Sequence, residues 1–240
     1  MKISVVMPAY DEAGNVEKLA TRFYDVFSKL NVDFELLYIL QGTKAASGYD
    51  ELEKLITQGM DKIRLVHFPG PIGVYPAFKV GYNNVAKDAT HVLTLDADLN
   101  HQPEELPRFI DAITSTNADI VIGSRYIPGG SITGMPKWKR VLSKLMNHFF
   151  NIISQVKAND KTSGYRLMKK EVAMRVKDLV TFRNFESYVE FLIRAQRQGF
   201  KMTEVPITFV FRTTGVSKMK IFNTTMGYIK LITRTSILRK

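Results

Sequence analysis

Short apolar runs alternate with amphipathic stretches through the first half of the chain. The run ISVVMPAY at residues 3–10 is mostly apolar and β-branched, which is typical of a strand buried on both faces. From about Gly14 to Leu30 the apolar residues recur with the period of a helix. Further strands are predicted at residues 34–40, 63–68, 91–98 and 119–126, with helical patterns between them. This alternation predicts an α/β fold with a mostly parallel central sheet covered by helices.

The second half of the chain has a less regular pattern. We expect helices at about residues 137–156, 171–179 and 186–198, a strand at 163–170, and an edge strand at 201–210 that contains Pro206. A last amphipathic stretch, rich in basic residues, runs from about residue 219 to 239. The pattern therefore divides the chain into a main domain, residues 1–218, and a basic amphipathic C-terminal helix, residues 219–240.

Composition narrows the class of protein. The chain has 240 residues, 45% of them hydrophobic, which suits one large domain with a substantial core. It has no cysteine, so disulfides and thiolate metal sites are excluded. No apolar run is long enough to cross a membrane, and a strand that begins at Ile3 leads us to expect no secretory leader. The net charge of +11 predicts a polyanionic partner, such as nucleic acid, an anionic membrane or a phosphorylated ligand.

Two carboxylates end the fourth predicted strand. Asp96 and Asp98 are separated by one residue, so along a strand both would point the same way. Such a pair is either a solvated turn or a site for a cation that neutralises the repulsion. With Asn100 or His101 it would make a site for Mg²⁺ or Mn²⁺. In parallel sheets ligands bind at the carboxyl ends of strands, where Tyr10 is also expected.

The charges are unevenly distributed along the chain. No acidic residue occurs from residue 120 to 159, or after Glu204. The basic residues of these two regions include Arg125, Lys137, Lys139, Arg140, Lys144, Lys157, Arg212, Lys218, Lys220, Lys230, Arg234, Arg239 and Lys240. Apolar residues accompany them at 142–156 and 221–240, which suits helices that lie in an anionic membrane interface; packing against the core is the alternative. We find no recognition-helix pattern and no aromatic–basic sheet motif, so no nucleic acid is expected as a partner.

Seven segments resemble glycosyltransferase family 2, and most closely its dolichyl-phosphate mannosyltransferase-like branch. They occur in the family's order and are VVMPAYDEAGNV (5–16), LDADLNHQPEELP (95–107), IVIGSRYIPGG (120–130), WKRVLSKLMN (138–147), KTSGYRLMKKEV (161–172), YVEFLIRAQRQGFKMTEVPITF (188–209) and RTTGVSK (212–218). The resemblance implies a nucleotide-sugar-binding fold of the glycosyltransferase A type, with residues 1–218 as the catalytic domain.

The resemblance also implies an activity. It is the inverting transfer of a hexose, preferably mannose from GDP-mannose, to a dolichyl or polyprenyl phosphate, assisted by Mg²⁺ or Mn²⁺. Alternatives are a UDP-linked glucose or N-acetylhexosamine donor, a glycan hydroxyl as acceptor with Glu186 or Glu190 as its base, and a catalytically inactive or nucleic-acid-binding relative. We expect the protein in the cytoplasm, peripheral on the cytoplasmic face of a membrane, with an anionic membrane surface as partner. A membrane-anchoring partner, or a transmembrane segment beyond this chain, would complete the attachment.

The resemblance assigns roles to individual residues. The implied metal ligands are Asp96, Asp98 and Asn100. The implied catalytic residues are Asp96, Asp98 and Arg212. The nucleotide-sugar would contact Pro8, Tyr10, Glu12, Gln41, Asp96 and Lys218, with Arg212, Ser217 and Lys218 on a loop over the donor phosphates. The acceptor phosphate would contact Arg125, Lys139, Arg140 and Ser143. Arg166 would line a donor or acceptor pocket or form a salt bridge, and Glu190 would lie near the sugar or pair with Arg194.

Two segments depart from the family pattern. Leu40 and Gln41 stand where the family's second strand normally ends in two acids that read the nucleotide base. Gln41 offers a donor and an acceptor to a base but no charge, so both GDP and UDP stay open. The segment at residues 69–78 also lacks the family's usual asparagine and basic residue.

Overall fold

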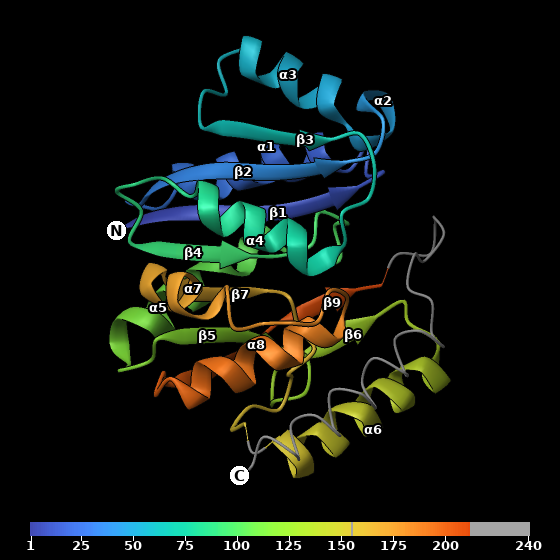
Figure 1. Ribbon diagram of the computed structural model, residues 1–240, viewed down its shortest axis with the longest axis vertical. Helices are drawn as coiled ribbons and strands as arrows, with labels where there is room; N and C mark the ends of the chain where they lie inside the picture. The colour runs from blue at the N-terminus through green and yellow to red at the C-terminus, as the bar shows by residue number, and fades with distance from the viewer. Residues whose placement is uncertain (155, 212–240) are drawn as a thin grey trace.

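The computed structural model, which describes residues 1–154 and 156–211, has the predicted α/β architecture. A seven-stranded sheet has the order β3-β2-β1-β4-β7-β5-β8 (Figure 1). Its strands are β1 (Lys2–Tyr10), β2 (Asp33–Gln41), β3 (Ile63–Phe68), β4 (His91–Thr94), β5 (Ile120–Ser124), β7 (Arg166–Lys169) and β8 (Met202–Pro206). Neighbouring strands are parallel except where β7 runs antiparallel between β4 and β5. The prediction of a mostly parallel sheet is confirmed.

Helices cover both faces of this sheet. They are α1 (Val16–Ser28), α2 (Lys44–Ser47), α3 (Tyr49–Thr57), α4 (Val74–Asn84), α5 (Leu106–Ser115), α6 (Lys137–Ser154), α7 (Lys170–Val176) and α8 (Glu186–Arg197), with a short 3₁₀ helix η1 (Pro103–Glu105) before α5. In Figure 1, α4, α7 and α8 lie in front of the sheet and α1 lies behind it. The predicted helices at 137–156, 171–179 and 186–198 are therefore confirmed to within a few residues.

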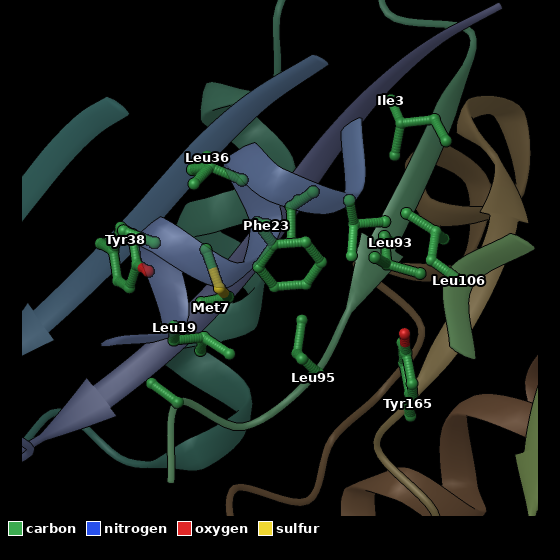
Figure 2. Packing of buried hydrophobic residues seen from close by; sticks show 14 of the residues in the cluster. Ile3, Met7, Leu19, Phe23, Leu36, Tyr38, Leu93, Leu95, Leu106 and Tyr165 are labelled. Atoms are coloured by element: carbon green, nitrogen blue, oxygen red, sulfur yellow. The ribbon is translucent and has the colours of Figure 1, made fainter. Parts of the chain in front are cut away.

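The hydrophobic core divides into two layers because successive strand residues point to opposite faces. Val5 and Met7 of β1 point toward Phe23 of α1, and Val6 points toward Phe78 of α4. Figure 2 shows the first layer, in which the ring of Phe23 lies among aliphatic side chains of the sheet. A strand with both faces buried explains why residues 3–10 read as a continuous apolar run.

The fourth strand ends earlier than the sequence predicts. β4 stops at Thr94, so Asp96 and Asp98 lie in the loop that follows and not on the strand. A turn follows at residues 98–100: Leu99 has a left-handed backbone conformation with φ of 63°, and Asp98 accepts a hydrogen bond from the Asn100 amide. The prediction that strand geometry aligns the two carboxylates is therefore wrong, although the acids do follow the carboxyl end of β4.

The last predicted strand is divided into two strands in the structure. β8 forms the edge of the large sheet, as predicted, and ends at Pro206. Ile207 is fully buried and donates its amide to the Ser124 carbonyl. The chain then continues as β9 (Thr208–Val210), which pairs with β6 (Ser131–Thr133) in a separate two-stranded sheet. The predicted strand at 163–170 is confirmed only at residues 166–169.

Helix α6 lies to one side of the sheet (Figure 1). Three apolar side chains near its start are 58–60% exposed: Trp138, Val141 and Leu145. Within the described residues, no helix is long and apolar enough to span a bilayer. The predicted C-terminal helix at 219–240 lies outside the described residues.

Candidate active site

The loop after β4 holds the two acids in a defined arrangement. The Asp96 Oδ1 accepts a hydrogen bond from the Tyr188 hydroxyl at 2.7 Å. The two oxygens of Asp98 accept from Asn100, from its backbone nitrogen at 3.1 Å and from its side-chain Nδ2 at 2.5 Å. The Asn100 carbonyl in turn accepts from the Val210 amide of β9. Both acids are half-buried, so the loop presents fixed carboxylates at the carboxyl edge of the sheet.

The oxygen atoms of this loop suit a divalent cation that takes its remaining ligands from water or phosphate. Within the described residues, no group of three or more histidine, aspartate or glutamate side chains could hold a metal by itself. Two carboxylates beside an amide side chain nevertheless suit Mg²⁺ or Mn²⁺, which commonly keep waters and take phosphate oxygens as remaining ligands. The residues Asp96, Asp98 and Asn100 therefore fit the predicted cation chemistry.

His101, the other ligand considered, has a different environment. Its ring is buried against Tyr165 and Phe209, with centroids 5.3 Å from each. Burial, together with the nearby Arg125, lowers the pKa of His101 to about 3. The ring is therefore neutral near pH 7 and packs as part of the core.

β1 lies between β2 and β4, the strand that leads into the acid loop. Tyr10 pairs in register with Gln41, and Pro8 lies two residues earlier on β1. Tyr10 is 37% exposed, whereas Glu12 is buried and accepts a hydrogen bond from the Asn15 side chain at 2.7 Å. Glu12 therefore helps to organise the turn that starts α1.

Gln41 has a structural role that the sequence pattern did not indicate. Its buried amide oxygen accepts hydrogen bonds from the Ile72 and Gly73 nitrogens, at 2.8 and 3.3 Å. These bonds hold the loop that precedes α4 against the end of β2. The acceptor half of the Gln41 amide is thus already used within the protein.

The basic residue at the end of β5 is paired with an acid. Arg125 binds Asp160 in a bidentate manner, Nε to Oδ2 at 2.6 Å and Nη2 to Oδ1 at 2.8 Å. Asp160 is fully buried, and burial would raise its pKa, but Arg125 and Thr162 bring the pKa of this carboxyl below its ordinary value. An anion that binds Arg125 would therefore share the guanidinium with Asp160.

The first turns of α6 lie close to Arg125. The Ser143 hydroxyl is 2.6 Å from the Tyr126 hydroxyl, and the Arg125 guanidinium lies 5.3 Å from the Tyr126 ring. Arg140 is exposed and donates to the Ile132 carbonyl at 2.7 Å, while the Lys139 ammonium lies 5.5 Å from the Trp138 ring. The structure thus links Ser143 to Arg125 through Tyr126. Arg212, Ser217 and Lys218 lie outside the described residues.

Arg166 is buried, with its side chain against Tyr188 of α8. It donates from Nη2 to the carbonyls of Lys161 and Tyr188, both at 2.9 Å. Its guanidinium also lies 5.5 Å from the Tyr188 ring. Burial lowers the pKa of Arg166 to about 10.

Glu190 pairs with Arg194, as one of the two sequence interpretations predicted. Its buried carboxylate lies 3.0 Å from the Arg194 Nη2. It also accepts from the backbone nitrogens of Thr181 and Phe182, at 2.8 and 2.9 Å. Glu190 therefore holds the segment that leads into α8.

Comparisons with known proteins show the family and agree with the fold. The sequence model of glycosyl transferase family 2 matches residues 4–177, so the chain belongs to that family and is an enzyme. A polyprenol monophosphomannose synthase of Mycolicibacterium smegmatis is 32% identical over 90% of this chain and 80% of that protein. A dolichol-phosphate mannosyltransferase of Pyrococcus furiosus is 29% identical over 92% of this chain but only 60% of its own length. Within the family the chain belongs to the dolichyl-phosphate mannosyltransferase-like branch, as predicted.

Solved structures confirm the glycosyltransferase A fold. Glucosyl-3-phosphoglycerate synthase of Mycobacterium tuberculosis, in complex with Mn²⁺, UDP-glucose and phosphoglyceric acid, superposes with a TM-score of 0.68 over 98% of this chain and 80% of that one. The same enzyme with UDP gives 0.67 over the same shares. Identities of 17% and 16% make these likenesses evidence for the fold alone.

Proposed function

We propose that the protein transfers mannose from GDP-mannose to a dolichyl or polyprenyl phosphate, with inversion at the anomeric carbon. The observation that carries the proposal is the acid loop after β4, with Asp96 and Asp98 held at the carboxyl edge of the sheet. The names of the two sequence relatives support the sugar and the lipid phosphate.

The acid loop supplies the proposed donor site. Asp96 and Asp98, with Asn100 beside them, would hold Mg²⁺ or Mn²⁺. When bound, such a cation stabilises the negative charge that builds on the departing diphosphate. Tyr10 and Pro8 would contact the nucleoside from the adjacent end of β1, and Gln41 would shape this pocket through the loop it holds. Arg212 and Lys218 stay predicted contacts of the donor phosphates.

The acceptor needs little help from a general base. A phosphate monoester has its second pKa near 6, so it is already a nucleophilic anion near neutral pH. The protein must hold it in line behind the anomeric carbon. Arg125, Lys139, Arg140 and Ser143 are the proposed contacts, with Arg125 shared between Asp160 and the acceptor phosphate.

A UDP-linked sugar is the second candidate donor. The similar glucosyl-3-phosphoglycerate synthase structures contain UDP, and Gln41 brings no charge that would select one base. A glycan hydroxyl acceptor would leave Glu186 as its base, because the carboxylate of Glu190 binds the 181–182 backbone and Arg194.

A donor screen tests the proposal directly. Purified protein is mixed with Mg²⁺ or Mn²⁺, a polyprenyl phosphate and each common GDP- or UDP-sugar, and labelled lipid product is measured. We expect GDP-mannose to give the highest rate. The variant Asp98→Ala should lose at least about 100-fold in rate, because it removes a cation ligand from the leaving-group side. Asp111→Ala, at an exposed position on α5, serves as the matched control. Transfer unchanged in Asp98→Ala would refute the site.

A further inference from the structure

We propose that Tyr188 is a positioning residue for the cation site: its hydroxyl fixes the Asp96 carboxylate in the orientation that binds the metal. This inference rests on the proposed function, since it assumes that Asp96 is a ligand. It assigns a role to a tyrosine on α8 that is 92 residues from Asp96 in the sequence.

The hydrogen bond between Tyr188 and Asp96 is short. The Tyr188 hydroxyl is 2.7 Å from the Asp96 Oδ1, within the range for a charge-assisted bond. One oxygen of the Asp96 carboxylate is thus held by a buried phenol.

Tyr188 is itself held in place by its surroundings. The side chain is 7% exposed, and its ring lies 5.8 Å from Phe78 and 6.3 Å from Phe185. Gly164 lies against it: a Cβ there would be 3.1–3.2 Å from the ring and hydroxyl of Tyr188. The close approach of a glycine backbone leaves the phenol little freedom to turn away from Asp96.

Arg166 supports the same tyrosine from the protein interior. It donates to the Tyr188 carbonyl, and its guanidinium lies 5.5 Å from the Tyr188 ring. Among the described residues, its buried Nε has no hydrogen-bond partner, and it lines a cavity of about 10 Å³ together with Thr94 and Tyr188. This volume is at the lower limit for holding one water molecule. Arg166 therefore places a fixed positive charge behind the Tyr188–Asp96 pair.

Such an outer contact changes metal affinity without touching the metal. Hydrogen bonds that orient ligating side chains commonly account for 10–100-fold in affinity. If Tyr188 has this role, removal of its hydroxyl weakens cation binding, whereas removal of a neighbouring hydroxyl does not.

The test measures Mn²⁺ binding in the presence of GDP, or of UDP if that is the nucleotide that binds, by electron paramagnetic resonance. Tyr188→Phe is compared with wild type and with Tyr82→Phe, the control, since Tyr82 is a buried tyrosine that lines the same cavity. We expect Tyr188→Phe to raise the Kd for Mn²⁺ by about 10-fold or more, and Tyr82→Phe to leave it unchanged. Equal Kd values for the two variants would overturn the inference.

A second variant protects the test against a folding defect. Gly164→Ala keeps the Tyr188 hydroxyl but pushes the ring with its new methyl group. It should weaken Mn²⁺ binding as Tyr188→Phe does, while an unchanged Kd in Gly164→Ala, with both variants folded by circular dichroism, would count against the positioning role.

Asp98→Ala separates this inference from the proposed function. If Asp98→Ala binds Mn²⁺ as tightly as wild type, the cation site itself is wrong. If Asp98→Ala weakens binding and Tyr188→Phe does not, only the role of Tyr188 fails.

Discussion

Asp160 carries a fully buried charge that is paired with Arg125. It is fully buried and bound by Arg125 through two side-chain hydrogen bonds. We expect Asp160→Asn to lower the free energy of unfolding by about 3 kcal/mol, because it leaves a buried guanidinium without its counter-charge. Urea denaturation measures the change. Asp178→Asn, which breaks an exposed pair with Lys79, is the control and should change stability much less.

The same pair predicts a dependence of stability on pH. The pKa of Asp160 is lowered in the folded protein from an ordinary value of 3.8, so the unfolded chain takes up its proton first. The contribution of Asp160 is therefore present above about pH 4 and is lost as pH falls through the lower folded pKa. The stability difference between wild type and Asp160→Asn should shrink in acid. A difference that stays constant below pH 4 would contradict the assignment.

At the scale of elements, α6 is the part of the described chain best suited to a membrane surface. Its exposed apolar residues Trp138, Val141 and Leu145 recur at helical spacing, and the exposed Lys137 and Lys144 each precede one of them directly. We propose that this face lies in the interface of an anionic leaflet.

Vesicle flotation tests the role of α6. With vesicles of phosphatidylcholine and phosphatidylglycerol, the double variant Trp138→Asp with Leu145→Asp should bind about tenfold or more weakly, because two apolar side chains no longer enter the interface. Leu179→Asp, at an exposed apolar residue in the turn after α7, is the control. Binding of the double variant equal to that of the control would exclude α6 as the docking element.

Element boundaries also mark the limit of what local pattern can predict. Residues 63–68 match the predicted strand because an apolar run with turn residues on both sides determines its own extent. β4 ends at Thr94, four residues before the predicted end. In the loop that comes next, Asp98 accepts a hydrogen bond from Asn100, and hydrophobic periodicity does not predict such side-chain contacts. The strand after Lys201 divides at Ile207 because β9 pairs with β6. The sequence around residue 207 does not predict that pairing.

For the whole molecule, ligand binding should couple to stability through the acid loop. A nucleotide and cation that bind only the folded state stabilise it by about 2.7 kcal/mol at 100 times their Kd. We expect GDP with Mn²⁺ to raise the Tm by about 5–10 °C for a domain of this size, and EDTA to remove most of that rise. Differential scanning fluorimetry measures both. A rise of the same size in Asp98→Ala would show that the cation acts elsewhere.

The sequence by itself determined the local features of this protein. The α/β order, the family and the acids Asp96 and Asp98 follow from apolar periodicity and short motifs, since each depends on residues close together in the chain. Only the tertiary structure decided the partners of those residues. Tyr188 reaches Asp96 across 92 positions, Asp160 reaches Arg125 across 35, and Gln41 reaches Ile72 across 31. These contacts depend on how strands and helices are arranged in space. A pattern of residues along the chain does not specify which distant side chains that arrangement brings together.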